Sequence, residues 1–427
     1  MIIRFSVENW RSFKEPVTLD MVAGSETQHA ERLSKIKKFR LKVLPVAAIY
    51  GPNASGKTKF VEALMFFQDL IVSGNKHGEP FDIRRFKLDK DFLKQPTNFS
   101  LTALIDGQIY RYELSLLPEK VVHEELTLEN SSSSYTLFKR DANGHVVFDE
   151  DYFNKDRLAF LDLVVSATRE NQLLLTNGIQ LNTFEFQPFY DWIKNCWLIL
   201  SPYSQFNSIH RFADPSDKIS KQLVEFLQRF GTGIDHFETI KTPLETPSDP
   251  SLMPVIKAKL REVGSKIRLH DRILGLDGDE LVSEKLISVH KNQNGEPVKF
   301  TLRDESDGTV RLLDLIPAIV NTGNNGNLVI IVDEMDSSLH TKVLEQLILY
   351  FLGKCNPDSR RQLIFTTHDV NIMTQETFRR DELWMINKYR NGESSLYSIS
   401  EFKGVRHDKD IRKIYLEGAF GAIPGSL

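Results

Sequence analysis

Residues 51–58 have the side chains and spacing best suited to phosphate chemistry in this chain. They read GPNASGKT and match the pattern G-x-x-x-x-G-K-[S/T] in full. Glycines in such a loop let backbone N–H groups turn toward phosphate oxygens, and the start of a following helix adds partial positive charge. Lys57 can then reach the β- and γ-phosphates, while the Thr58 hydroxyl can bind magnesium. The loop predicts an ATP site formed by Asn53, Ala54, Ser55, Gly56, Lys57 and Thr58.

A second candidate lies far along the chain, where an apolar stretch ends in two carboxylates. Residues 328–332 read LVIIV and are followed by Asp333 and Glu334. A carboxylate at the end of a buried strand can hold magnesium directly or through water, and we assign this role to Asp333. Glu334 can orient or deprotonate an attacking water, which makes it the candidate catalytic base. The alternative is a strand that merely ends in solvated acids.

Two further segments would complete such a site. Residues 363–367 read LIFTT and lead into His368, and an imidazole at a strand end can sense a γ-phosphate by hydrogen bonding. Residues 305–313 read ESDGTVRLL, in which Ser306 can cap a helix and Gly308 can let its first turn approach a ligand. Alone, these would be a structural histidine and an ordinary helix cap. Their positions on either side of the acidic stretch favour the functional interpretation.

The elements that must position these residues follow from the apolar pattern. Residues 43–50 form a short apolar stretch that leads straight into the loop, and apolar residues from 60 to 70 recur at helical spacing. Strand, glycine loop and helix are the context that a phosphate loop requires. From residue 308 onward, helical and strand-like stretches alternate, as in a parallel sheet. We therefore expect an α/β fold of the P-loop NTPase type.

Three parts are predicted along the chain. Residues 1–150 carry the loop and β signals, including the hairpin dipeptides Asp106-Gly107 and Asn143-Gly144, and form an antiparallel β lobe with the first half of the ATPase head. Residues 151–280 are predicted to be a mainly helical insertion, with a proline-rich linker at 242–254. Residues 281–427 form the second half of the head.

The composition is that of an ordinary soluble protein. The chain has 427 residues, of which 41 % are hydrophobic and 26 % charged, and its net charge is -4. As a whole it is therefore no strong attractor of nucleic acid or anionic membranes. Its two cysteines lack C-x-x-C spacing, which argues against a disulfide scaffold or a zinc site. With no signal-peptide pattern and no apolar stretch long enough to span a bilayer, we expect a cytoplasmic protein without a membrane partner.

The order of these motifs resembles that of ABC-type ATPase heads of the SMC, RecF and OLD kind. More closely, the chain resembles the stand-alone ABC-type ATPases of prokaryotic defence islands, the RloA-like proteins. The likeness covers both ends of the chain well and the middle poorly. It is carried by residues 9–13 (NWRSF), the loop at 51–58, residues 305–313, residues 333–336 (DEMD), residues 367–369 (THD) and residues 415–424 (YLEGAFGAIP).

The resemblance implies a role for each matching position within one subunit. Lys57 and Thr58 would hold phosphate and magnesium, and Asp333 would hold the metal. Glu334 would be the hydrolytic base and His368 the γ-phosphate switch. In addition, Arg11 would reach a phosphate of the nucleotide in the same subunit. The implied cofactors are ATP and Mg²⁺.

The resemblance also implies that one head cannot complete the site. Ser306 and Gly308 would contact the ATP bound to the opposite subunit, and residues 336–339 would lie at the dimer seam. The protein would therefore act as a homodimer, or a higher homo-oligomer, that closes on two ATP molecules. The chain departs from the transporter signature at Glu305, Asp307 and Thr309.

Three functions remain open at this point. The first is an ATPase sensor or regulator in a prokaryotic anti-phage defence or toxin–antitoxin-like system, with an effector nuclease or toxin supplied by a partner protein. The second is a RecF-like repair or recombination ATPase that binds DNA directly. The basic stretch at 32–42 could contact nucleic acid phosphates, although a solvated loop explains it as well. The third is a scaffold that binds ATP only to assemble. The resemblance favours the first function, and no OLD-type nuclease pattern follows His368.

Overall fold

The computed structural model describes residues 1–242, 252–262, 266–269, 272–278, 280–320, 327–402 and 410–422. The chain forms two compact units. The first consists of Met1–Ser201, Asn325–Met335 and Leu349–Leu427, and the second of Pro202–Asn324 and Asp336–Ile348. Residues 151–201 of the predicted insertion therefore belong to the first unit. Among the described residues, no helix has the length and hydropathy needed to cross a bilayer.

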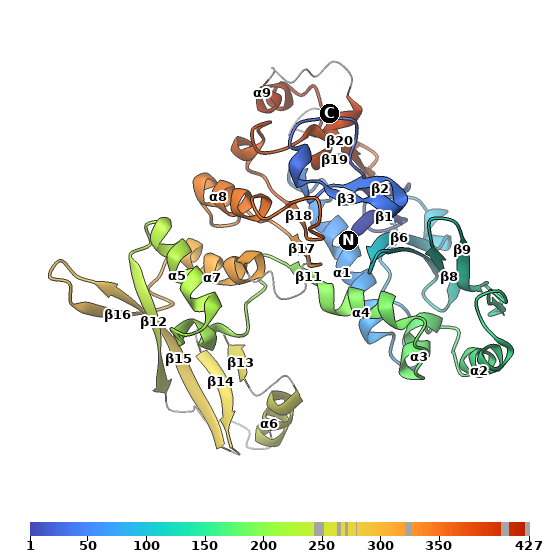
Figure 1. Ribbon diagram of the computed structural model, residues 1–427, viewed down its shortest axis with the longest axis horizontal. Helices are drawn as coiled ribbons and strands as arrows, with labels where there is room; N and C mark the ends of the chain where they lie inside the picture. The colour runs from blue at the N-terminus through green and yellow to red at the C-terminus, as the bar shows by residue number, and fades with distance from the viewer. Residues whose placement is uncertain are drawn as a thin grey trace. The chain divides into compact units, whose positions relative to one another are not determined.

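A six-stranded sheet in the first unit joins strands from distant parts of the sequence (Figure 1). Its order is β11 (Trp197–Leu200), β17 (Val329–Val332), β18 (Gln362–Thr366), β5 (Val46–Tyr50), β19 (Leu383–Lys388) and β20 (Ser394–Ser398). Neighbours are parallel from β11 to β19, and only β20 is antiparallel. The strands β17, β18 and β5 are buried at every position, as expected for parallel strands covered on both faces.

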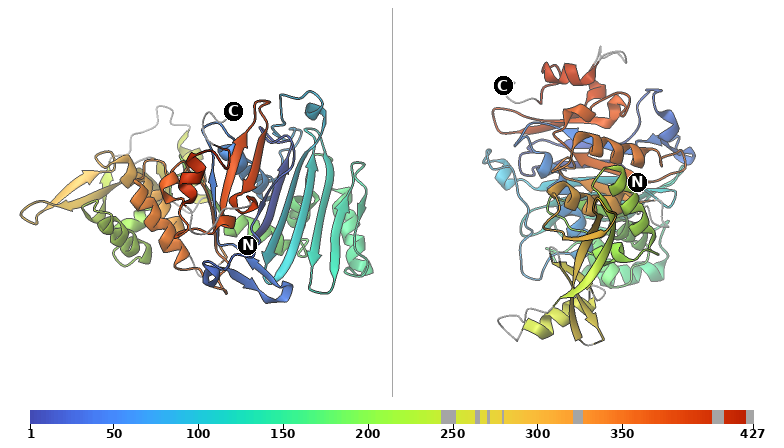
Figure 2. Two further views of the ribbon diagram at one scale, coloured as in Figure 1. Left: turned by 90° about the horizontal axis from the view of Figure 1, so that it is seen from above. Right: turned by 90° about the vertical axis from the view of Figure 1, so that its left-hand side faces the viewer.

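The described part of the first unit also contains a seven-stranded antiparallel sheet and a short hairpin of β3 (Ser34–Ile36) and β4 (Leu41–Val43). Figure 2 (left) shows the strands of the sheet side by side, coloured from blue to green. Both predicted hairpins are present, and positive φ angles at Asp106 (47°) and Gly107 (80°) give the first its tight turn. The strand order is β10 (Val146–Val147), β9 (Ser134–Arg140), β8 (Val121–Glu129), β7 (Gln108–Leu116), β6 (Thr97–Ile105), β1 (Ile2–Glu8) and β2 (Val17–Asp20).

The helix α1 (Lys57–Ser73) connects the two sheets through the core. The ring of Phe67 contacts Phe5 of β1 and Tyr112 of β7, with centroids 5.6 and 6.0 Å apart. The same ring stacks at 6.3 Å on Trp197, which belongs to the six-stranded sheet. The helix that follows the glycine loop is therefore fixed by apolar contacts with both sheets. Three further helices complete the first unit before residue 201: α2 (Lys155–Ser166), α3 (Leu174–Gln180) and α4 (Gln187–Cys196).

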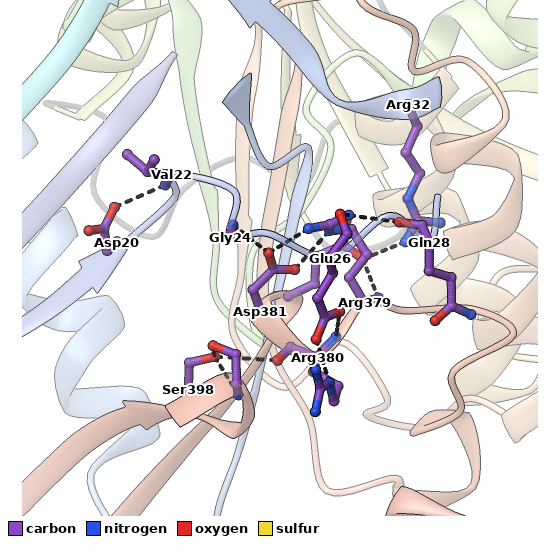
Figure 3. Close-up of polar contacts among 12 residues, drawn as sticks. Asp20, Val22, Gly24, Glu26, Gln28, Arg32, Arg379, Arg380, Asp381 and Ser398 are labelled. Atoms are coloured by element: carbon purple, nitrogen blue, oxygen red, sulfur yellow. Dashed lines mark hydrogen bonds and ion pairs between the residues drawn. The ribbon is translucent and has the colours of Figure 1, made fainter. Parts of the chain in front are cut away.

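A strap at residues 24–32 fastens the N-terminal segment to the start of β19 (Figure 3). The fully buried Arg379 donates to the backbone carbonyls of Glu26 (2.9 Å) and Gln28 (2.7 Å). The same guanidinium pairs with Asp381 at 2.7 Å. These bonds satisfy a charge that would be unfavourable in the protein interior without partners. The strap therefore ties together segments from opposite ends of the chain.

The second unit contains a five-stranded sheet that the sequence analysis did not predict as such. The prediction of a mainly helical insertion agrees with α2 to α4, with α5 (Lys218–Arg229) and with the helix at 252–262. It is wrong for the described segments 234–242, 266–269 and 272–277, which are strands. A β-bulge between Ile234 and His236 breaks the two-residue alternation that would have revealed the first strand. The strands are β12 (Ile234–Thr242), β15 (Glu280–Lys291), β14 (Arg272–Asp277) and β13 (Lys266–Leu269), with β16 (Pro297–Thr301) paired to β15.

The remaining helices are α6 (Leu252–Glu262), α7 (Asp307–Val320), α8 (Thr341–Leu352) and the short α9 (Ile411–Leu416). Of the predicted linker at 242–254, residues 243–251 lie outside the described residues, and α6 begins directly afterwards.

Candidate ATP site

The glycine loop leaves β5 at the carboxyl edge of the six-stranded sheet and runs into α1. Close packing requires glycine at both of its ends. A Cβ on Gly51 would lie 2.4 Å from the carbonyl oxygen of Ile386, and one on Gly56 would lie 2.9 Å from Oγ of Ser12. Gly56 also has a φ of +120°, which L side chains rarely adopt. The loop therefore has the tight, backbone-exposing form that phosphate binding requires.

Lys57 lies inside this loop with its side chain buried. Its ammonium donates to the backbone carbonyls of Gly51 (2.6 Å) and Pro52 (3.1 Å). The same Nζ is 3.5 Å from Nδ1 of His368. The predicted phosphate-binding lysine and the predicted switch histidine are therefore neighbours, although 311 positions separate them in the sequence.

Parallel pairing brings the acidic residues to the same edge of the sheet. The strand β18 lies between β5 and β17, so the loop, Asp333 and His368 all follow the carboxyl ends of adjacent strands. Asp333 is only 2 % exposed, and its Oδ1 accepts a hydrogen bond from Thr366 Oγ1 at 2.6 Å. Glu334 has a left-handed φ of 48°, a strained conformation that often marks functional sites.

A cavity of about 800 Å³ joins these parts, and its volume is typical of small-molecule sites. Its wall includes residues 53–59 of the loop and helix, Glu334 and His368. Asp333 is not a wall residue and lies buried beside Glu334. The structure thus brings the predicted loop, base and switch residues to one cavity within the first unit. Their individual roles stay predictions.

Arg11 also lines the cavity, on a turn with a left-handed φ of 55° at this residue. Its guanidinium pairs with Glu62 of α1 at 2.9 Å. The neighbouring Trp10 donates from Nε1 to the carbonyl of Lys59 at 3.0 Å, which holds the turn against the helix. Arg11 therefore lines the same cavity as the loop while it pairs with Glu62, and its contact with a phosphate stays a prediction.

The sequence analysis missed several cationic residues in this wall. Three of them, Arg84, Arg85 and Lys87, are close in sequence, and Lys388 at the end of β19 contributes another charge. The run RRFKL at 84–88 is a basic signal that could have been noticed, whereas nothing in the sequence marks Lys388. With Arg11 and Lys57, these residues make the wall suited to a polyanion such as a triphosphate.

The donor set also fits magnesium. Mg²⁺ prefers oxygen ligands, and it is commonly held by one or two protein oxygens together with substrate phosphates. Thr58 lines the cavity with a hydroxyl, and Asp333 offers a carboxylate oxygen, Oδ2, that accepts no hydrogen bond from the part of the chain that the structure describes. These two residues are the ones that would hold the ion.

Ser306 and Gly308 belong to the second unit. Ser306 Oγ accepts from the backbone N–H of Thr309 at 3.1 Å, so it caps α7 as expected. A Cβ on Gly308 would lie 2.6 Å from the carbonyl oxygen of Ser338. This glycine is therefore required for packing against residues 336–339. A contact of either residue with ATP in an opposite subunit stays a prediction.

Known proteins resemble this chain at the level of family and fold. The family model described as "AAA domain, putative AbiEii toxin, Type IV TA system" matches residues 46–374. No curated protein matches the chain. Similar solved structures include an SMC head domain from Thermotoga maritima, with 14 % identity, a TM-score of 0.38, and coverage of 93 % of this chain and 98 % of that one.

Two further solved structures are similar over comparable lengths. One is an SmcHead bound to the C-winged helix domain of ScpA, with 12 % identity, a TM-score of 0.43, and coverage of 93 % and 97 % of the two chains. The other is an Smc head domain with an extended coiled coil bound to the C-terminal domain of ScpA from Pyrococcus furiosus. It is 11 % identical, with a TM-score of 0.36 and coverage of 93 % and 96 %.

The matched family region begins at Val46, the first residue of β5, and extends past His368. It therefore contains the glycine loop, the acidic strand and His368, which meet at one edge of the sheet. Their nucleotide-binding roles stay predictions, and the family match supports a P-loop ATPase. The chain belongs to the AAA-domain family described as putative AbiEii toxin, Type IV TA system.

Proposed function

We propose that this protein is a Mg²⁺-dependent ATPase that dimerises head to head on ATP. It acts as a sensor or regulator in a prokaryotic anti-phage defence or toxin–antitoxin-like system and controls an effector supplied by a partner protein. The observation that carries the proposal is the single cavity lined by the glycine loop, Glu334 and His368. The family description, which names a toxin and a type IV TA system, supports the biological setting.

The residues of the site divide the chemistry between them. Backbone N–H groups of the loop and the Lys57 ammonium bind and orient the phosphates. Thr58 and Asp333 would hold a magnesium ion, which would supply charge neutralisation for the phosphates. Glu334 orients the attacking water and accepts its proton, and His368 donates a hydrogen bond toward the γ-phosphate. Arg11 adds charge at the mouth of the cavity.

Hydrolysis is tested with the full-length chain and a Glu334→Gln variant. We expect the variant to bind ATP like the wild type but to release phosphate at least about 100-fold more slowly, because a positioned base contributes 10²–10⁴-fold. Binding is measured by calorimetry and turnover by phosphate release. Glu376→Gln, which changes an exposed carboxylate outside the cavity wall, is the matched control. A wild-type chain that binds ATP without releasing phosphate would instead support the scaffold function.

The biological role needs a separate test. We expect a protein purified from its native cell to carry a stoichiometric partner, and loss of Lys57 to change the activity of that partner. Adding duplex DNA to the phosphate-release assay tests the RecF-like alternative. Stimulation that falls steeply with salt would replace the proposed role with direct DNA binding.

A further inference from the structure

Thr366 is the last residue of β18 and lies between the two strands that carry the nucleotide site. It pairs with Ile49 of β5, one residue before that strand ends. On the other side, the preceding residue Phe365 pairs with Val332 of β17, directly before Asp333. The side chain is fully buried. Nothing in the sequence motif singles out this threonine, because the motif is recognised by His368 two positions later.

Three hydrogen bonds connect Thr366 to the acidic segment. Its Oγ1 is 2.6 Å from Oδ1 of Asp333 and 2.8 Å from the backbone nitrogen of Glu334. Its carbonyl oxygen accepts from the backbone N–H of Met335 at 3.0 Å. A carboxylate can only accept and a backbone N–H can only donate, so the hydroxyl proton must point at Asp333. The Thr366 hydroxyl therefore donates to Asp333 and accepts from the backbone N–H of Glu334.

This pattern constrains the two residues that the proposed ATPase needs. Glu334 has a left-handed φ of 48°, which is unfavourable for a residue with a side chain. Hydrogen bonds from its own N–H and from that of Met335 hold the backbone in this conformation. At Asp333 the hydroxyl donates to Oδ1 and so restricts rotation of the carboxylate. Oδ2 is left for a metal ion or its bound water.

We propose that the Thr366 hydroxyl is the positioning group of the magnesium site, which sets the orientation of Asp333 and the backbone of Glu334 together. The inference rests on the proposed ATPase function and deepens it. Groups that hydrogen-bond to a metal ligand typically change metal affinity or activity by 10- to 100-fold when they are removed. An ordinary strand-end hydrogen bond would affect stability and leave the metal dependence unchanged.

The test compares the wild type with Thr366→Val, which keeps the shape but lacks the hydroxyl, and Thr366→Ser, which keeps the hydroxyl. ATP binding is measured by calorimetry first with EDTA and then across a Mg²⁺ titration. With EDTA, all three proteins should bind ATP within about 2-fold, because the loop is unchanged. In the titration, Thr366→Val should need a Mg²⁺ concentration roughly 10- to 100-fold higher than the wild type for the half-maximal change in ATP affinity. The concentration for Thr366→Ser should stay within about 3-fold of the wild-type value.

Two controls keep the test decisive. Thr127→Val removes another buried threonine hydroxyl, on β8 and outside the cavity wall, and should leave the Mg²⁺ titration unchanged. If Thr366→Val does not fold, Thr366→Ala removes the same hydroxyl without adding a methyl group next to a carboxylate. If the folded variant without the hydroxyl reaches the half-maximal effect at the same Mg²⁺ concentration as the wild type, the inference is wrong. The ATPase proposal is unaffected by that result. A wild-type protein that binds no ATP overturns both.

Discussion

The Lys57 ammonium donates to carbonyl groups of its own loop, and the residue also lines the cavity. Replacing it with alanine should weaken ATP binding by about 10- to 100-fold, because a hydrogen bond to a charged group contributes about 1.5–3 kcal/mol. Calorimetry on the folded variant measures this loss. Lys76→Ala, whose side chain is 81 % exposed, is the control and should bind like the wild type. Equal affinities for all three proteins would remove Lys57 from the binding site.

Gly308 offers a prediction about packing in the second unit. A Cβ at this position would meet the carbonyl oxygen of Ser338 at 2.6 Å, and backbone cannot move aside easily. Gly308→Ala should therefore lower the free energy of unfolding by about 1–3 kcal/mol, the usual effect of overpacking. Urea unfolding measures the change, with Asp307→Ala as the exposed neighbouring control. An unchanged midpoint for Gly308→Ala would contradict the packing role.

Individual residues also show what sequence alone can predict. Short motifs with a recognisable chemistry identified four candidate residues, namely Lys57, Asp333, Glu334 and His368. Thr366 and Lys388 could not be found in this way, since their importance depends on which strands become neighbours. Gly308 was expected to approach a ligand closely, and the close approach that the structure shows is to the backbone of Ser338.

At the scale of elements, the strap at residues 24–32 is paired with a buried titratable group that lies directly before β19. Glu382 is fully buried and pairs with Arg32. Burial raises its pKa to about 7, from an ordinary value of 4.5, against the opposing effect of Arg32. The folded protein therefore binds this proton more tightly than the unfolded chain does. Its contribution to stability is fully present below pH 4.5 and is lost as the pH rises through 7.

This behaviour predicts the effect of a Glu382→Gln variant. Between pH 4.5 and 8, the wild type should lose up to roughly 3 kcal/mol of unfolding free energy that the variant does not lose, because each pKa unit corresponds to about 1.4 kcal/mol. Urea unfolding at several pH values measures the difference between the two proteins. Identical pH dependence in both would show that Glu382 does not titrate in this range.

The secondary structure could be predicted from sequence where local signals were strong. The Asp-Gly and Asn-Gly dipeptides predicted the two hairpins, and the continuous apolar run before the glycine loop predicted β5. The sheet of the second unit was missed because a bulge in β12 disturbs its alternation, and because the pairing of β12 with β15 joins strands far apart in sequence. Such pairings are decided by packing rather than by local preference.

For the whole molecule, the proposed dimer makes a prediction about assembly. The Glu334→Gln variant, which retains ATP, should run as a dimer or larger in the presence of ATP and Mg²⁺ and as a smaller species without them. Light scattering coupled to gel filtration measures the mass. A double variant that combines Glu334→Gln with Ser306→Arg places a bulky cation at the cap of α7. It should still bind ATP but should show no increase in mass with ATP and Mg²⁺. A constant mass for Glu334→Gln with nucleotide bound would contradict dimerisation on ATP.

The position of β5 has a consequence for how the protein is made. Both of its neighbours, β18 and β19, come from residues after 361, more than three hundred positions downstream of the glycine loop. A nascent or prematurely terminated polypeptide therefore displays the complete nucleotide motif on a strand with two open edges, which favours aggregation. Nucleotide capture should therefore depend on synthesis of residues 362–388, and fragments that stop before them should lack it.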